Sequence, residues 1–209
     1  SNKKENTIFF IFLRIVFFIY LIIPSINHYY FRTYALDYAY YNQAFWDFAH
    51  FRQNINTVFF PEVNHFQIHA HFTTLLISPL YWILNWAFKT YTLLIIQSTF
   101  LTLGAYGTYK FIKLKTDHFL ISILGALHYF VLWGHFSSFE GDFIPVTLTC
   151  SLMPLFFLYY EKGKFHLSSI LFLFVLLTKE NIAIWFLFIS IFLIIIHIKR
   201  KRFLLMGSL

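Results

Sequence analysis

Six long apolar runs, separated by polar breaks, are the main feature of the hydropathy pattern. They cover residues 7–24, 91–112, 118–133, 145–160, 165–178 and 182–198. A helix needs about 20 residues to cross the hydrocarbon core of a bilayer, which is about 30 Å thick. The pattern therefore predicts an all-α, polytopic integral membrane protein. A single transmembrane domain, residues 1–209, is expected to contain about six transmembrane helices.

Residues 25–90 form the longest break, and two helices that lie along the membrane surface are predicted within it. The first, residues 34–50, has no Gly or Pro over 17 residues. The second, residues 72–88, is apolar enough to be a span. It contains Pro79, however, together with Trp82 and Trp86, a residue type that prefers the membrane interface. Two topologies follow, one in which residues 72–88 cross the membrane and one in which they lie on its surface.

The distribution of basic residues favours the surface position. If residues 72–88 do not cross, eleven of the 16 Lys and Arg residues fall on the side of both termini. If they cross, the cluster Lys110–Lys115 and every later cluster move to the opposite side. Cytoplasmic loops carry an excess of Lys and Arg. The sequence therefore predicts an integral protein of the cytoplasmic (inner) membrane, with both termini cytoplasmic and residues 25–90 as an outer loop.

Composition excludes several classes of protein. Hydrophobic residues make up 59% of the chain and charged residues only 12%, whereas soluble domains have roughly 25% charged residues. An ordinary soluble enzyme, a disordered chain and a nucleic-acid-binding domain are therefore excluded. The net charge of +7 is explained as an orientation signal, so no nucleic-acid partner is expected. The single cysteine, Cys150, cannot form an internal disulfide.

The outer loop contains two acids on the helix predicted for residues 34–50. Asp37 and Asp47 are ten residues apart, which is about 15 Å along a helix. They therefore cannot form one paired-carboxylate site. Asp37 lies near the start of this helix and not far beyond the end of the first span. The alternative for each acid is helix capping or simple solvation.

Two histidines further along the outer loop give a weak metal signal. His65 and His69 are four residues apart, so a helix would place them on one face. No third ligand follows at a matched spacing. Interfacial histidines that are hydrogen-bonded to backbone or lipid headgroups are the competing interpretation.

Two later polar segments interrupt the apolar pattern on the outer side. Glu140 and Asp142 flank a glycine at the mouth of a span, either as a carboxylate edge of an outer cavity or as a solvated turn. Lys179 follows the short run 165–178, so we expect it to lie below the outer surface. An ionisable group at such a depth indicates a functional site. The alternative is a Lys179–Glu180 ion pair at a helix–helix turn.

These segments, taken in order, resemble a known family. The sequence contains Leu36-Asp37-Tyr38, Asn42 to Asp47, His71-Phe72, Ser78 to Tyr81, Asp142-Phe143-Ile144-Pro145 and Lys179-Glu180-Asn181. This set resembles a bacterial and archaeal family of predicted membrane proteins of unknown function. That family is in turn similar to the GT-C glycosyltransferases, in particular the protein mannosyltransferase and aminoarabinose transferase branch. The resemblance covers residues 36–181 and rests on the ordered set rather than on any one motif.

The resemblance implies an activity and roles for named residues. The substrate would be a polyprenyl-phosphate-linked sugar, delivered sideways from the membrane lipids. Asp37 would be the general base that takes a proton from the acceptor hydroxyl. Lys179 would stabilise the lipid-phosphate leaving group. Glu140 or Asp142 would orient the acceptor or a divalent metal, although the cofactor is left open.

The sequence departs from this branch in two respects. Glu180 stands where the transferases have a small residue, and full enzymes of this class have more spans. This chain could therefore be a fragment, a reduced or degenerate relative, or one subunit of an assembly with other membrane subunits. The alternative function is a non-catalytic structural or assembly subunit of a membrane complex. A small transporter or channel is disfavoured, because the spans contain no acids.

Overall fold

The computed structural model describes residues 2–33, 35–55, 57, 63–68, 70–141 and 143–206. The helices in chain order are α1 (Asn2–Tyr29), α2 (Ala35–Ala49), α3 (His65–Ile68), α4 (Phe72–Phe88), the 3-10 turn η1 (Lys89–Tyr91), α5 (Thr92–Thr116), α6 (Phe119–Val131), α7 (Trp133–Gly141), α8 (Pro145–Glu161), α9 (Phe165–Leu176) and α10 (Glu180–Met206). Within the described ranges the chain has no strand, so the predicted all-α class is confirmed.

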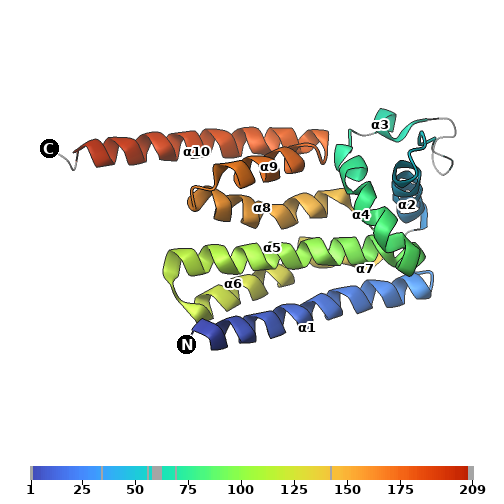
Figure 1. Cartoon of the computed structure of the whole chain (residues 1–209), viewed down its shortest axis with the longest axis horizontal. Coiled ribbons are helices and arrows are strands. Elements are labelled where there is room, and N and C mark those ends of the chain that lie inside the picture. The colour runs from blue at the N-terminus through green and yellow to red at the C-terminus, as the bar shows by residue number, and fades with distance from the viewer. Residues whose placement is uncertain are drawn as a thin grey trace.

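The longer helices run along one common direction (Figure 1). α5 is central and packs against α1, α6 and α8, while α9 packs against α8. α2, α3 and α4 gather at the end opposite the two chain termini (Figure 1). We call this end the cap end, and it also contains the α7–α8 and α9–α10 connections. The terminal end contains the two termini and the α5–α6 and α8–α9 turns.

The ambiguous segment 72–88 forms one helix, α4, which is inclined to the bundle axis at the cap end (Figure 1). Its buried face, which includes Thr73, Ile77 and Tyr81, packs on α2 and α5. Trp82 and Trp86 lie on the exposed face. Because aromatic side chains favour the membrane–water boundary, this placement fits the predicted surface helix better than a span.

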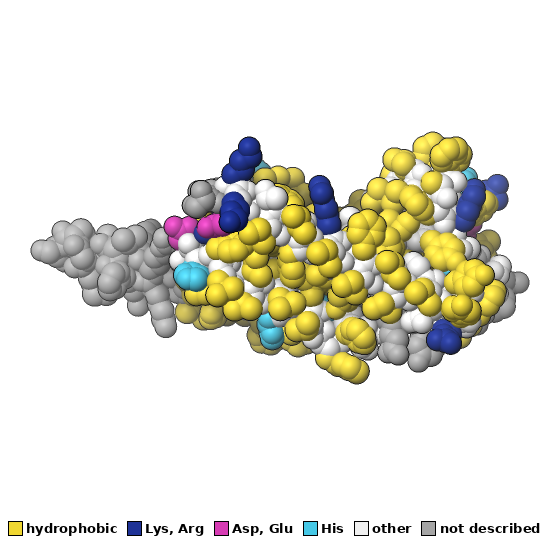
Figure 2. Space-filling view, turned by 90° about the horizontal axis from the view of Figure 1, so that it is seen from below, with side chains coloured by type: hydrophobic (Ala, Val, Ile, Leu, Met, Phe, Trp, Pro, Cys, Tyr) yellow, Lys and Arg dark blue, Asp and Glu magenta, His cyan; other side chains and the backbone are white. Residues whose placement is uncertain are grey.

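An apolar stripe follows the exposed side of α1. Its residues recur every three or four positions and are all exposed: Ile8, Ile11, Ile15, Phe18, Ile22 and Ile26. This spacing places them on one face along the whole helix. Apolar side chains also cover most of the face that Figure 2 shows. A contiguous apolar surface of this extent indicates contact with lipid or protein rather than with water.

Two helices of the described chain are long and apolar enough to cross a membrane, namely Lys3–Tyr29 and Glu180–Ile198. Buried residues make up only 17% and 11% of their apolar stretches, so neither helix has the surroundings of a soluble protein's core. Phe119–Val131 and Phe165–Leu176 are apolar but shorter. The six-span topology therefore stays a prediction.

Polar side chains point inward and join the helices. Gln97 of α5 is buried; its Nε2 donates to Ser138 O and its Oε1 accepts from Ile144 N, each at 3.2 Å. Ser98 Oγ donates to Tyr20 O at 3.1 Å and so joins α5 to α1. Hydrogen bonds of this kind hold helices together where lipid surrounds them and hydrophobic burial gives little net driving force.

Two glycines allow α5 and α8 to approach closely. A Cβ built on Gly104 would collide with the Tyr129 hydroxyl and would lie 2.7 Å from Ser151 O. A Cβ on Gly107 would lie 2.8 Å from Leu155 N on α8. Both glycines are buried, and their small size lets the two backbones come together as small-residue motifs do in membrane helix pairs.

The segment around residues 133–141 differs from the loop that the sequence indicates. It forms helix α7, which packs against α1. His135 is buried and lies against Tyr129, with their ring centroids 4.4 Å apart. The side of α7 that contains His135 therefore faces the interior of the bundle. The weakly amphipathic sequence of α7 does not indicate which side this is.

Candidate functional site

Two tyrosine hydroxyls attach α2 to its neighbours at the cap end. Tyr38 OH donates to the backbone carbonyl of Thr90, at the turn between α4 and α5. Tyr81 OH, from α4, donates to Asn42 Oδ1 at 2.9 Å. Because Tyr38 and Tyr81 are both almost fully buried, these bonds fix the register of α2 on the cap.

Tyr41 is the point at which three segments of the cap meet. Its hydroxyl lies 3.4 Å from His71 Nδ1, just before α4. Its ring also packs edge-on against Phe143, at the start of α8, with centroids 5.6 Å apart. His71 and Phe143 are both about 1% exposed. α2, the start of α4 and the residue that follows Asp142 therefore lie side by side.

A backbone hydrogen bond adds the α9–α10 connection to this group. Thr73 N, in the first turn of α4, donates to Leu177 O at 3.2 Å. Thr178 is fully buried, and Lys179 beside it is half-buried. All four segments that carry the family resemblance are thus assembled at the cap end, although they are far apart in sequence.

The structure describes the side chains of some candidate site residues and not of others. Asp37 is exposed in the first turn of α2, one helical turn before Tyr41 and on the same side of the helix. The side chains of Asp37 and Lys179 form no hydrogen bond or ion pair with any described residue. Glu140 belongs to α7, but its side chain lies outside what the structure describes. Asp142 lies outside the described residues altogether.

Two other acids have structural roles. Asp47 Oδ2 accepts a hydrogen bond from Asn54 Nδ2 at 2.8 Å, and Asp47 O accepts one from Arg52 N at 2.8 Å. These bonds hold the chain as it leaves α2. Glu180 is the first residue of α10, where the helix dipole favours a negative charge. This position gives Glu180 a structural role at the start of α10.

The described residues do not form a metal site around the predicted histidine pair, His65 and His69. His65 is fully buried, and its ring lies 5.2 Å from that of Tyr40 and 5.7 Å from that of His71. It therefore does not face lipid headgroups, as an interfacial histidine would. His69 lies outside the described residues. In the part of the chain that is described, no three His, Cys, Asp or Glu residues are grouped to hold a metal ion.

Sequence reasoning gave no role to Tyr41 or His71, which are central to the assembled cap. Tyr41 is one of three tyrosines within Tyr38–Tyr41, and His71 comes directly before an apolar run. A tyrosine on a predicted surface helix could have indicated a hydrogen-bonded contact, because the Tyr hydroxyl usually finds a partner when it is buried. The tyrosine does not by itself show which segment it contacts, so this indication is useful only when the partner segment is known.

A cavity of about 760 Å³ lies beside α2 at the cap end. Its lining includes His28 at the end of α1, Tyr38 and Asn42 of α2, and Tyr91. The His28 ring lies between Tyr38 and Tyr91, with centroid distances of 4.8 and 4.9 Å. A concave, aromatic surface with a few polar groups is typical of a small-molecule site, and Asp37 directly precedes Tyr38 in α2.

The cap tyrosines give an expected pH dependence of stability. Burial raises the pKa of Tyr40 and that of Tyr81 from 10.0 to about 12. Above about pH 10 the unfolded chain therefore loses these protons before the folded chain does, and stability falls as the pH rises toward 12. We expect the melting temperature of the Tyr81→Phe variant to fall less steeply between pH 10 and pH 12 than that of the unaltered chain. The measurement is thermal unfolding of the detergent-solubilised protein.

The matched control is Tyr30→Phe, because Tyr30 is exposed. It should leave the dependence of the melting temperature on pH unchanged. Identical alkaline slopes for the Tyr81→Phe and Tyr30→Phe proteins would contradict this assignment.

The comparisons with known proteins agree with a membrane location. A family model described as a predicted membrane protein, DUF2079, matches residues 27–209. The chain belongs to the DUF2079 family. No curated protein and no solved structure matches the chain.

The DUF2079 match covers every element from α2 to α10, and therefore all of the cap-end segments described above. The description of the family gives a membrane protein and no activity. Together with the exposed apolar helices, it places this DUF2079 chain in a lipid environment.

Proposed function

We propose that this DUF2079 chain is a GT-C-like glycosyltransferase, or a relative of one, that acts on a polyprenyl-phosphate-linked sugar at its cap end. The observation that carries the proposal is the convergence of four separate segments. Tyr41 joins α2 to His71 and Phe143, and Thr73 joins α4 to Leu177. A scaffold needs no such meeting of segments that contain Asp37 and Lys179.

The depth of Lys179 supports a phosphate-binding role. α9 has 12 residues, or about 18 Å of helix, which is short against a hydrocarbon core of about 30 Å. If the helix starts at the opposite membrane surface, Lys179 lies below the outer surface. A half-buried lysine at that depth, without an acid partner among the described residues, suits an anionic ligand such as a lipid phosphate.

The proposed reaction is a displacement at the anomeric carbon of the sugar. Asp37 takes the proton of an acceptor hydroxyl as its oxygen attacks that carbon. The bond from the anomeric carbon to the phosphate oxygen breaks, and the lipid phosphate leaves with the electron pair. Lys179 stabilises the negative charge that grows on this phosphate. Glu140 or Asp142 would orient the acceptor or a divalent metal.

The proposal includes an orientation. The terminal end contains Lys3, Lys4, Lys113, Lys115 and Lys162, and the positive-inside rule places such an end in the cytoplasm. The cap end then faces outward. A lipid-linked sugar is bound to the bilayer by its chain, so it reaches the cap sideways from the outer leaflet.

Native mass spectrometry of the detergent-purified protein tests the lipid-phosphate site. We expect polyprenyl phosphate to co-purify with the unaltered chain and its occupancy to fall at least about tenfold in Lys179→Ala, because the variant loses the charge that pairs with phosphate. Lys89→Ala is the matched control, since Lys89 is an exposed lysine of η1 at the same end. It should retain the lipid.

The alternative is a non-catalytic assembly subunit, and the observation that favours it is the exposure of α10. Trp185, Phe188 and Phe192 of α10 are all more than half exposed, so this helix has room for a neighbouring protein. If only bulk phospholipid is found on both the unaltered chain and Lys179→Ala, the transferase is rejected in favour of the subunit.

A further inference from the structure

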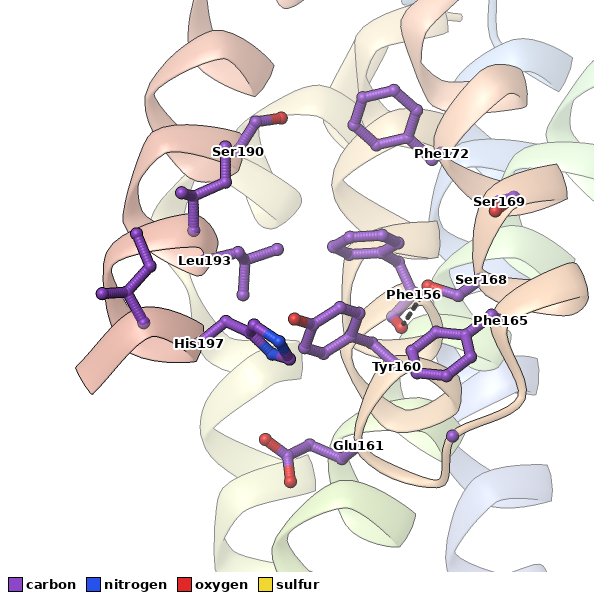
Figure 3. Close-up of a pocket in the computed structure, with 13 residues that line it drawn as sticks. Phe156, Tyr160, Glu161, Phe165, Ser168, Ser169, Phe172, Ser190, Leu193 and His197 are labelled. Carbon is purple, nitrogen blue, oxygen red and sulfur yellow. Dashed lines mark hydrogen bonds between the residues drawn. The ribbon is translucent and has the colours of Figure 1, made fainter. Parts of the chain in front are cut away.

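A second cavity, of about 910 Å³, lies at the terminal end between α8, α9 and α10. Figure 3 shows that α10 contributes Leu193 and His197 on one side, while α8 and α9 contribute Phe156, Tyr160 and Phe172. This volume is at the upper end of the range for small-molecule sites. It is separate from the cap end, which contains α2 and the α9–α10 connection (Figure 1).

Polar and apolar groups are separated along this cavity. Tyr160, Glu161 and His197 lie together toward the α8–α9 turn, and Phe172 lies further inside (Figure 3). Ser168 is buried, and its hydroxyl donates to Phe156 O at 3.4 Å. The hydrogen-bond partner of this hydroxyl is therefore a residue of the cavity wall, and the hydroxyl does not require a ligand. The cavity thus has a polar mouth and a largely apolar interior, as an amphiphile with one headgroup and a hydrocarbon chain requires.

The charge at the mouth is positive. Glu161 forms an ion pair with Lys115 of α5, which neutralises the acid at the rim. Lys162 and Lys164 flank Gly163 in the α8–α9 turn and are exposed. Neither lysine forms an ion pair within the described part of the chain. Two basic groups therefore remain to interact with an anion at this position.

The cavity is placed so that a lipid can reach it from the bilayer. Only 11% of the apolar stretch of α10 is buried, and Ile170 and Leu173 of α9 are exposed. These surfaces face lipid if the helices cross the membrane. A hydrocarbon chain can then enter between α9 and α10 without passing through water.

We propose that this cavity binds one anionic phospholipid, with an acyl chain between α8, α9 and α10 and its phosphate beside Lys162 and Lys164. The hydroxyl of Tyr160 and the imidazole of His197 provide further hydrogen-bonding groups at the mouth. A zwitterionic phospholipid has the same chain but no net charge, so it binds less tightly. This site is independent of the proposed transferase function.

Native mass spectrometry of the delipidated full chain, titrated with phosphatidylglycerol and with phosphatidylcholine, tests the site. We expect phosphatidylglycerol to bind about tenfold more tightly, since each basic residue at a membrane surface raises affinity for anionic lipid several-fold. The double variant Lys162→Ala/Lys164→Ala should lose this preference. The control Lys3→Ala/Lys4→Ala removes the same charge from the terminal end outside the cavity and should keep it.

A variant that fills the cavity tests the position of the chain. Ser190 of α10 lines the cavity (Figure 3), and Ser190→Trp should lower the affinity for both lipids at least about fivefold. Equal affinity of the unaltered chain for the two lipids overturns the proposal. It is also overturned if the Lys3/Lys4 variant loses as much preference as the Lys162/Lys164 variant. If Ser190→Trp does not fold, the two lysine variants decide the question alone.

Discussion

Sugar transfer by the Asp37→Asn variant is expected to be about 1,000-fold slower than transfer by the unaltered chain. Loss of a general base lowers rates by about 10²- to 10⁴-fold. An amide has nearly the shape of the carboxylate, but it cannot accept the proton of the acceptor hydroxyl. The side chain of Asp37 is exposed and has no hydrogen-bond partner among the described residues, so the fold should survive the change. The measurement is release of polyprenyl phosphate from a panel of lipid-phosphate sugars in liposomes.

The control for this prediction is Asp47→Asn on the same helix. Asp47 accepts a hydrogen bond from Asn54, and an asparagine oxygen at residue 47 can still accept it. Transfer should therefore fall less than about threefold, in keeping with the small effects of changes that preserve structure. If Asp37→Asn keeps more than a tenth of the activity while Asp47→Asn behaves in the same way, Asp37 is not the base.

The second large effect concerns the contact between α5 and α8. We expect Gly107→Ala to destabilise the protein by about 2–3 kcal/mol, because the added methyl group would lie 2.8 Å from Leu155 N on the neighbouring backbone. Backbone atoms cannot turn aside as a flexible side chain can, so the two helices must separate. Gly104→Ala should have a similar effect through Ser151 O, at 2.7 Å. Thermal unfolding in detergent, followed by loss of the monodisperse peak, measures both.

Gly134→Ala is the matched control for the glycine variants. A Cβ on Gly134 meets nothing within 4 Å, and alanine favours a helix by about 1 kcal/mol over glycine. This variant should therefore be as stable as the unaltered chain or slightly more so. If Gly107→Ala and Gly134→Ala melt at the same temperature, the close approach of α5 and α8 does not contribute to stability.

Local signals explain how much of the fold could be predicted. The helical class follows from apolar runs of 14–22 residues, which are too long for membrane-spanning strands and close to the length of a membrane-spanning helix. Residues 72–88 contain a proline and two tryptophans, and they form the inclined helix α4 at the cap end. The helix α7 could not be predicted in this way, because it depends on burial of His135 against Tyr129, and these two residues belong to different helices.

The candidate site was predictable in its parts but not as an assembly. Lys179 was singled out because a lysine that follows a short apolar run is costly to bury in a membrane, and Asp37 because its segment resembles a motif of the transferase branch. The hydrogen bond between Tyr41 and His71, and that between Thr73 and Leu177, join positions 30 and 104 residues apart. No local pattern encodes such a pairing, because it depends on how whole helices pack.

The sequence alone determined that this protein is helical, rich in apolar surface and suited to a membrane, since these properties depend on residue type and spacing along one helix. Only the tertiary structure decided that the motif-bearing segments meet at one end and that a cavity with a basic rim lies at the other. The physical reason is that close approach of helices depends on small residues such as Gly104 and Gly107 and on interhelical hydrogen bonds such as those of Gln97. Their partners are fixed by the packing of the whole bundle.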